Sequence, residues 1–239
     1  SDHIYLGAGS PSYLAKHLRD SLAMKYIQLQ HEKGSSLCLT SASSIAFSRW
    51  LLPVYEIFKV GEDLHWGKGL DFFQPFNLDI SVIPHWNNND GGLKVDTSRC
   101  YLGKDRMGKL INLLPTSAVI IGIDEHTGLL MDFDKQIGFV MGKGSVHVLK
   151  NGIEKQFGDQ AIIPFVNFGE FNYPNIFHYT DDIDIESNNI PPEIKNMAEL
   201  RWKARKNKHW GEADELRSKI SELGYSIKDS TDGYDLIKG

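Results

Sequence analysis

The sequence predicts an α/β fold, in which a mostly parallel sheet is flanked by helices and a small helical unit follows at the C-terminus. Three short, β-rich apolar runs each stop abruptly at a polar residue: Ser35–Thr40 at Ser41, Ile80–Pro84 at His85, and Val119–Ile123 at Asp124. Such runs are typical of buried parallel strands. Segments with helical spacing lie between them, as crossover connections between parallel strands require.

The first elements are a strand, a glycine-rich turn and a helix. Ile4–Leu6 is strand-like, and Gly7–Pro11 follows it directly. Apolar residues between Ser12 and His31 then recur at helical spacing, with a serine before a proline as the N-cap signal. A parallel sheet normally has earlier βα units before such a junction. We therefore expect an N-terminally truncated fragment of the fold.

Further elements alternate until the pattern changes after residue 128. A helix is predicted for 42–50, an irregular aromatic covering loop for 53–73, and a helix for 104–114. From Leu129 to Phe165 the pattern favours antiparallel hairpins, with Asn151-Gly152 as a strong turn signal.

The C-terminal part differs in composition. Residues 170–192 are rich in Asn, Asp, Tyr and Pro without a clear period, which suits a linker. Charged helices are expected for Glu193–Lys208 and Gly211–Leu223. The predicted organisation is therefore an α/β domain over 1–169, a linker over 170–192 and a helical segment over 193–239.

Composition excludes several classes of protein. With 41% hydrophobic and 24% charged residues, the 239-residue chain has an ordinary globular composition, and its net charge of −5 argues against a chain-wide nucleic-acid surface. No apolar stretch approaches the roughly 18 residues of a membrane helix, so no membrane partner is expected. Cys38 and Cys100 are too few for a disulfide framework or a metal site, and they favour a reducing cytoplasm.

The polar residues that end the three runs suggest a chemistry. Ligands gather beyond the carboxyl ends of parallel strands, so a hydroxyl, an imidazole and a carboxylate would meet at one edge. These are the parts of an activated serine nucleophile. Ser41 has a strand before it and small residues after it, but Leu39 and Ser43 occupy the glycine positions of the usual Gly-x-Ser-x-Gly elbow. Helix capping by Ser41, a structural His85 and a solvated turn at 124–126 are the alternatives.

The ordered landmarks resemble peptidase family S51, which includes aspartyl dipeptidase and cyanophycinase and shares the class I glutamine amidotransferase-like fold. The resemblance covers roughly residues 3 to 165. The Gly-Ile-Asp-Glu-x-Thr string is its most specific part, and the landmarks are Ala8-Gly9-Ser10-Pro11, Ser41-Ala42, His85 and Gly122–Thr127.

The resemblance implies a role for each matching position. Ser41 would be the nucleophile, His85 the base, and Glu125 the acid, with Asp124 as the alternative acid. The N–H groups of Gly9 and Ala42 would form the oxyanion hole. The departures from the family pattern are Ala8, Leu39 and Ser43. The implied substrates are acidic-residue dipeptides or related amides, and no metal or organic cofactor is implied.

A second resemblance covers residues 195–239. The spacing of residues from Arg201 through Trp210 to Arg217, continuing to Gly224, Asp229 and Gly233, is similar to the C-terminal helical segment of cysteinyl-tRNA synthetases. No synthetase catalytic core, nucleotide motif or zinc ligand set precedes it here, so ligase activity is not implied. A basic stretch, which is either a tRNA-contacting surface or a solvated helix face, comprises Arg201, Lys203, Arg205, Lys206 and Lys208.

Two hypotheses follow. In the first, the chain is a serine-nucleophile hydrolase that cleaves small peptide or amide substrates through an acyl-enzyme. In the second, it is a catalytically degenerate hydrolase-fold scaffold whose tail binds tRNA or protein. The retained serine, histidine and acid favour the first, and the missing elbow glycines favour the second. The sequence does not indicate an oligomeric state.

Overall fold

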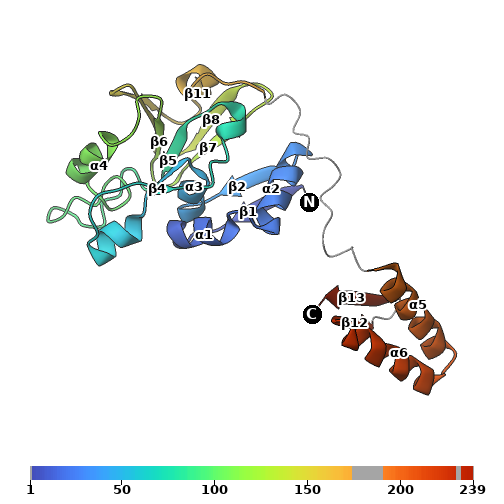
Figure 1. The fold of residues 1–239 in the computed structure, drawn as a ribbon. Coiled ribbons are helices and arrows are strands. Elements are labelled where there is room, and N and C mark those ends of the chain that lie inside the picture. The colour runs from blue at the N-terminus through green and yellow to red at the C-terminus, as the bar shows by residue number, and fades with distance from the viewer. Residues whose placement is uncertain (1, 174–190, 230–232, 239) are drawn as a thin grey trace. The chain divides into compact units, whose positions relative to one another are not determined.

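The computed structural model describes residues 2–173, 191–229 and 233–238. The chain divides into two compact units, residues 1–176 and 177–239, coloured blue to yellow and orange to red (Figure 1). Most of the predicted 170–192 linker lies outside the described residues.

The N-terminal unit alternates helices and strands before it becomes entirely β. Its strands are β1 (His3–Leu6), β2 (Ser36–Leu39), β3 (Trp50–Leu51), β4 (Gly67–Lys68), β5 (Ile80–Ile83), β6 (Val119–Ile123), β7 (Thr127–Asp132), β8 (Ile137–Gly142), β9 (Val146–Lys150), β10 (Ile153–Phe157) and β11 (Ile162–Pro164). Its α-helices are α1 (Pro11–Leu18), α2 (Leu22–Glu32), α3 (Ala42–Phe47) and α4 (Lys104–Ile111). Short helical turns lie at Glu56–Val60, Gln74–Phe76 and Phe165–Asn167.

The sheets mix parallel and antiparallel pairs. β1 pairs in parallel with β2, with His3 opposite Ser36, and β5 pairs in parallel with β6, with Ile80 opposite Val119. β9 and β10 extend the second pair in the order β10-β9-β6-β5, and both additions are antiparallel. β11-β8-β7 and β3-β4 are also antiparallel. The mixed α/β fold is thus confirmed.

The mostly parallel sheet is not confirmed among the described strands, because only the two pairs that carry the candidate site are parallel. After β6 the strands are joined by connections of a few residues, such as Asn151-Gly152 between β9 and β10. Connections of this length can join antiparallel neighbours, but they are too short for the crossover that parallel neighbours require. The predicted Asn-Gly hairpin turn is confirmed, with φ of 52° and 74° at its two residues.

The single helix expected from Ser12 to His31 is in fact two. Asp20 has a φ of 57°, which breaks the helical path. The side chain of Ser21 then accepts the N–H of Met24 at 3.1 Å and caps the second helix. A local capping residue therefore overrides the continuous apolar spacing.

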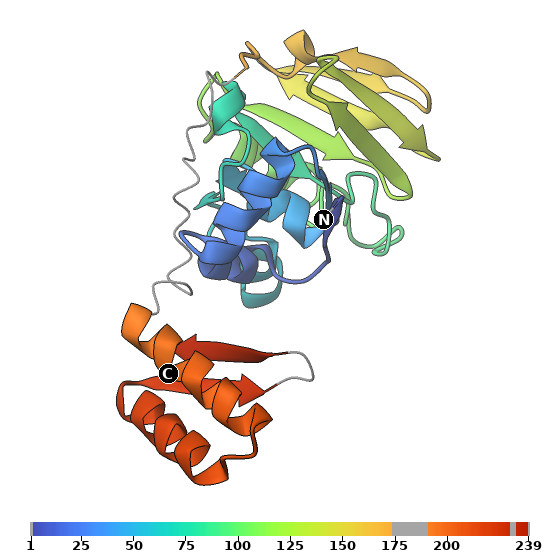
Figure 2. The ribbon, with the colours of Figure 1, turned by 90° about the vertical axis from the view of Figure 1, so that its right-hand side faces the viewer.

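One hydrophobic core joins the strands of the N-terminal unit. Ile80 and Ile83 in β5 and Val119 and Ile121 in β6 are fully buried, which explains why both strands are mainly apolar. Val140 of β8 and Val148 of β9 belong to the same cluster. Figure 2 shows α1, α2 and α3 gathered together in blue below the green and yellow strands. The buried strands thus hold the loops at their carboxyl ends on a rigid base.

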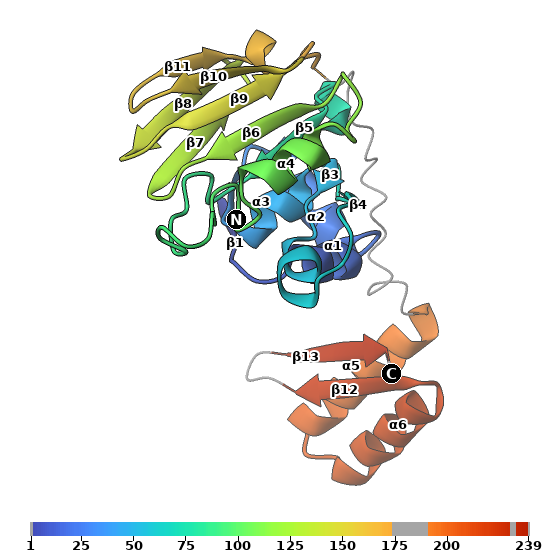
Figure 3. The same ribbon diagram turned by 90° about the vertical axis from the view of Figure 1, so that its left-hand side faces the viewer.

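The C-terminal unit contains a β-hairpin in addition to the expected helices. Its elements are α5 (Pro192–Lys206), α6 (Trp210–Glu222), β12 (Tyr225–Asp229) and β13 (Tyr234–Lys238), and both helices pack on one face of the antiparallel hairpin (Figure 3). The small core includes Ala198 of α5 and Ile220 of α6. The helical spacing extended only to residue 223, so it did not indicate the strands. None of the helices described in the chain is long and apolar enough to cross a membrane.

Candidate active site

Ser41 lies on a strained turn between β2 and α3. Its φ of 50° and ψ of −111° place it outside the regions that side-chain-bearing residues favour. Its side chain makes no capping hydrogen bond to α3, so side-chain capping does not explain a serine at this position. A strand-to-helix turn of this kind exposes a serine hydroxyl at the end of a sheet.

Ser43 fits the elbow even though it stands where the family has glycine. Its side chain is fully buried and its Oγ accepts the N–H of Thr40 at 2.7 Å. The same Oγ lies 2.8 Å from the carbonyl oxygen of Leu6 and 2.9 Å from that of Thr40. The hydroxyl therefore ties the elbow to the end of β1. The Cβ at this position does not disrupt the turn, contrary to what the missing glycine suggested.

His85 is positioned by the backbone at the end of β5. Its φ is 54°, and its carbonyl oxygen accepts the N–H of Cys100 at 3.1 Å. The next residue, Trp86, donates its N–H to Ile123 at the end of β6 and packs over Gly122. A Cβ at position 122 would lie 2.4 Å from the Trp86 ring, which explains this glycine in the Gly-Ile-Asp-Glu string.

The structure brings Ser41, His85 and Glu125 together. Ser41 Oγ lies 2.9 Å from His85 Nε2, and His85 Nδ1 lies 3.2 Å from Glu125 Oε1. The His85 and Glu125 side chains are 31% and 34% exposed, so the chain of contacts opens to solvent. In the tautomer that donates Nδ1–H to Glu125, Nε2 is free to accept the serine proton.

Asp124, the alternative acid, lies apart from this chain of contacts. Its carboxylate is buried, accepts the N–H of Ser145 at 2.9 Å and lies 3.4 Å from His147 Nε2. The other nitrogen of His147 is 2.8 Å from Glu154. Of the two adjacent acids, Glu125 is therefore the one that contacts His85, and Asp124 fixes the β6–β9 junction.

Asn87 and Asn88 hold Glu125 from two sides, and sequence reasoning missed both. Asn88 is 3% exposed and donates to Glu125 Oε1 at 2.8 Å, the same oxygen that faces His85. Asn87 Oδ1 accepts the backbone N–H of Glu125 at 2.8 Å. The available signal is the run Asn87-Asn88-Asn89, which begins two residues after the candidate histidine.

The network continues outward to Asp90 and Tyr101. Asn88 and the Tyr101 hydroxyl both donate to Asp90 Oδ2, at 3.0 and 3.1 Å. The Asn88 bond, and then the Tyr101 bond, hold the pKa of Asp90 below its ordinary value. The Tyr101 ring lies 5.9 Å from the His85 ring. An ionised carboxylate thus anchors the far end of the network that positions Glu125.

The segment that carries Tyr101 is itself strained. Arg99, Cys100 and Tyr101 have consecutive φ values of 57°, 58° and 68°. Each left-handed non-glycine residue costs roughly 1–2 kcal/mol. Arg99 stacks its guanidinium 3.8 Å over Trp86, and burial raises the pKa of the Cys100 thiol to about 12, so it stays protonated near neutral pH. Strain of this kind gathers at functional sites.

Gly9 and Ala42 line one cavity of about 320 Å³ beside Ser41. Neither residue's N–H donates a backbone hydrogen bond within the described parts of the chain. Ser10 caps α1 by accepting the N–H of Tyr13 at 3.2 Å, which fixes the loop that holds Gly9. The remaining lining residues are Tyr5, Leu6, Gly7, Ala8, Ser10, Tyr13 and Leu14.

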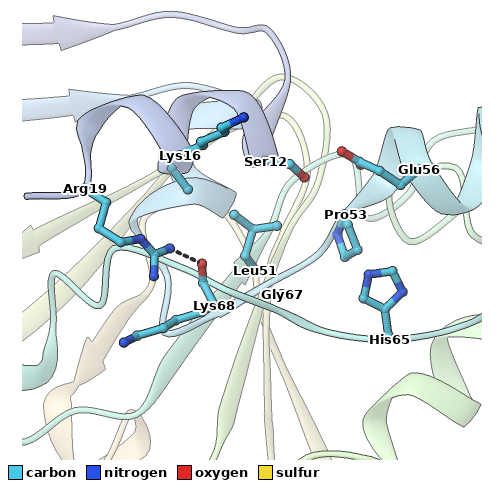
Figure 4. Close-up of a pocket in the computed structure, with 10 residues that line it drawn as sticks. Ser12, Lys16, Arg19, Leu51, Pro53, Glu56, His65, Gly67 and Lys68 are labelled. Atoms are coloured by element: carbon cyan, nitrogen blue, oxygen red, sulfur yellow. Dashed lines mark hydrogen bonds between the residues drawn. The ribbon is translucent and has the colours of Figure 1, made fainter.

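A larger cavity, of about 470 Å³, lies between α1 and the β3–β4 pair and is lined by none of the three site residues (Figure 4). Arg19 closes one side by donating to the carbonyl oxygen of Lys68, whose ammonium points away from the cavity. Of these two cavities, only the one beside Gly9 is lined by Ala42, the residue that follows Ser41.

Known proteins similar to the C-terminal segment are cysteine–tRNA ligases. Residues 188–234 match the model of the cysteinyl-tRNA ligase anticodon binding domain. The ligase of Methanosarcina acetivorans is 47% identical over 49 residues, which is 20% of this chain and 10% of that protein. The ligase of Chlamydia caviae is 46% identical over 44 residues, which is 18% of this chain and 9% of that protein. The chain thus spans about a tenth of the length of these relatives.

Of two solved structures similar to the chain, one is described as a peptidase and the other as a putative peptidase E. A peptidase from an acI-B1 actinobacterium is 26% identical with a TM-score of 0.53, and the match covers 69% of this chain and 60% of that one. A putative peptidase E from Listeria monocytogenes is 19% identical with a TM-score of 0.36, covering 66% and 61%. Both parts of the resemblance noted in the sequence, to peptidases and to cysteinyl-tRNA synthetases, are confirmed.

Proposed function

We propose that the N-terminal part of this chain is a serine hydrolase of peptide or amide bonds, with a class I glutamine amidotransferase-like fold. The observation that carries the proposal is the pair of contacts on His85: Ser41 Oγ at 2.9 Å on one nitrogen and Glu125 Oε1 at 3.2 Å on the other. A nucleophile, a base and a group that orients the base are the three requirements for activating a serine. The similarity to the actinobacterial peptidase supports it.

The proposed reaction has two halves. Ser41 Oγ attacks the substrate carbonyl carbon while His85 Nε2 takes the hydroxyl proton. The carbonyl oxygen becomes an oxyanion, which the N–H groups of Gly9 and Ala42 stabilise. The C–N bond then breaks, His85 returns its proton to the leaving amine, and an acyl ester remains on Ser41. Water, deprotonated by His85, hydrolyses this ester and restores the hydroxyl. Glu125 holds the imidazole throughout and stabilises its charged form.

The proposal extends to the organisation of the chain. The hydrolase domain is residues 1–169, residues 170–192 join it to the tail, and residues 193–239 form the second functional segment. Free Cys38 and Cys100 suit a reducing compartment, and we place the protein in the cytoplasm.

A fluorophosphonate probe tests the hydrolase against the scaffold hypothesis, because the probe labels only an activated serine. We expect the full chain to be labelled at neutral pH and the Ser41→Ala variant to remain unlabelled. Ser117→Ala is the matched control, since Ser117 is an exposed serine that bonds only to Asp79 in the described structure. An unlabelled parent chain with an intact fold supports the degenerate scaffold.

A second function, contact with tRNA, is proposed for the C-terminal unit because residues 188–234 match an anticodon binding domain. Arg201 does not contribute, since it is fully buried against Asp229. Of the other four residues of the basic stretch, Lys206 lies over Trp202 at 5.2 Å and Arg205 lies over the exposed Trp210 at 5.6 Å, whereas Lys203 pairs with Glu199 at 3.1 Å. Cations combined with exposed aromatic rings suit unpaired bases and phosphates.

Fluorescence anisotropy with a labelled tRNA transcript tests this second function. We expect binding that weakens as the salt concentration rises. The Lys206→Glu variant should bind more weakly than the parent, and the slope of log binding constant against log salt concentration should fall by about one. Lys155→Glu, in the N-terminal unit, is the control for the change in net charge. No binding at about 100 μM protein in low salt would contradict the proposal.

A further inference from the structure

We infer that the cavity beside Gly9 and Ala42 is the subsite for the acyl-side residue of the substrate, and that it takes an uncharged apolar or aromatic side chain. The inference rests on the proposed function, because it assumes that Ser41 attacks a carbonyl group there. It departs from the acidic substrates that the sequence resemblance implies.

Position is the first argument. Gly9 and Ala42, whose N–H groups are the proposed oxyanion donors, both line this cavity of about 320 Å³. A carbonyl oxygen bound by those groups is only two bonds from the Cα of the acyl-side residue. The side chain of that residue must therefore lie in or directly beside the cavity. The volume is sufficient for an aromatic side chain with part of its backbone.

The lining supplies the second argument, because none of the residues that line the cavity carries a charge. Its larger side chains are Tyr5, Leu6, Tyr13 and Leu14. An aspartate side chain placed here would lose water without gaining a cation, which is costly for a carboxylate. An apolar side chain instead gains stabilisation roughly in proportion to the area it buries.

The two tyrosines are the third argument. Tyr5 is 68% exposed and Tyr13 is 66% exposed, so each presents a large uncovered ring beside the same cavity. The Tyr5 hydroxyl lies 3.3 Å from Thr40 Oγ1, immediately before Ser41, which holds this ring against the elbow. Tyr13 is held by His17, with the ring centres 4.1 Å apart, and His17 does not line the cavity. Positioned, exposed aromatic rings are typical of binding surfaces.

Steady-state hydrolysis of dipeptides of the form X-Ala by the full chain tests the inference, with X as Phe, Leu, Asp or Arg. We expect kcat/KM for Phe-Ala and Leu-Ala to exceed that for Asp-Ala and Arg-Ala by at least about tenfold. The variant Tyr13→Arg places a cation at the cavity, and we expect it to narrow or invert the ratio of Phe-Ala to Asp-Ala. Tyr26→Arg, an exposed tyrosine on α2 outside the lining, is the matched control.

The outcomes separate the inference from the function on which it rests. Fluorophosphonate labelling together with a preference for Asp-Ala overturns the apolar subsite and leaves the serine hydrolase intact. Equal ratios in Tyr13→Arg and the parent chain also overturn the subsite. If Ser41 is not labelled and no dipeptide is cleaved, the proposed function fails and the subsite fails with it. An apolar preference that Tyr13→Arg alone reduces supports the inference.

Discussion

Ser41 Oγ and His85 Nε2 lie 2.9 Å apart, and both residues have a strained backbone, with φ of 50° at Ser41 and 54° at His85. Neither is glycine, the residue that accepts such angles without a steric cost. Two strained residues from different strand ends therefore meet at one hydrogen bond. Because strain of about 1–3 kcal/mol per residue persists only where the surrounding structure enforces it, this pairing marks the site more clearly than either residue alone.

The strain at Ser41 predicts a difference between two inactive variants. Ser41→Gly removes both the hydroxyl and the Cβ that makes the angle costly, whereas Ser41→Ala keeps the Cβ. We expect Ser41→Gly to be more stable than Ser41→Ala by about 1 kcal/mol in urea unfolding, although glycine usually destabilises. The same pair of changes at Ser117 should show the usual order. An equal or reversed order at Ser41 would mean that its angle is not strained.

Ser43 is expected to resist replacement by the family's glycine. Ser43→Gly removes a buried hydroxyl that bonds to Thr40 and lies 2.8 Å from the Leu6 carbonyl oxygen. The unfolding free energy should fall by about 1–3 kcal/mol, because buried polar groups lose their partner. Ser43→Ala separates the hydroxyl's contribution from backbone flexibility. A glycine variant that is more stable and more active than the parent would show that Ser43 is a defect of the elbow.

Asn88 is predicted to act on the reaction as a positioning residue through Glu125. Asn88→Leu should lower kcat/KM at least about tenfold with little change in KM, because Glu125 then loses one of its two side-chain contacts. Asn88→Asp places a further carboxylate beside Glu125 and Asp90, which favours protonated His85. Its activity should therefore rise only at higher pH than that of the parent. Asn89→Asp adds the same charge one residue away and serves as control; an identical shift there would rule out the specific contact.

Arg201 is predicted to be essential to the C-terminal unit. It is fully buried and donates to both carboxylate oxygens of Asp229, at 2.7 and 3.0 Å. Arg201→Ala removes two charge-assisted hydrogen bonds and the packing of a fully buried side chain, which should lower the free energy of unfolding by about 1.5–3 kcal/mol. Thermal unfolding of the full chain should show a lower midpoint for one transition only, that of the C-terminal unit. Arg217→Ala, at an exposed position of α6, should lower the midpoint of that transition far less.

The same pair predicts a pH dependence. The bond from Arg201 holds the pKa of Asp229 below its ordinary value of 3.8. A carboxyl group with a lowered folded-state pKa stabilises the fold above its ordinary pKa, and the stabilisation is lost as the pH falls through the lowered value. The stability difference between the parent and Asp229→Asn should therefore be largest near neutral pH and shrink below about pH 4. A difference that does not change with pH would contradict the ion pair.

Sequence patterns predict the strand ends of this fold well, for a physical reason. β5 and β6 are covered on both faces, so their apolar runs have sharp boundaries, and the polar residues after them lie at the sheet edge. Asn88 was not predictable in this way, because its contact with Glu125 joins residues 37 apart through a turn that follows no periodic pattern. The hydrogen bond from the Ser43 hydroxyl to the Leu6 carbonyl oxygen of β1 was not predictable either, because the pattern showed only that a glycine is missing at position 43.

Locating the fluorophosphonate adduct by tandem mass spectrometry tests the central claim most directly. The full chain is labelled at neutral pH, digested and sequenced, alongside the Glu125→Gln variant. The account predicts a single adduct on Ser41, formed at least about a hundredfold more slowly in Glu125→Gln because the imidazole loses the charge that orients it. An adduct on another serine, or none on a folded chain, would contradict it.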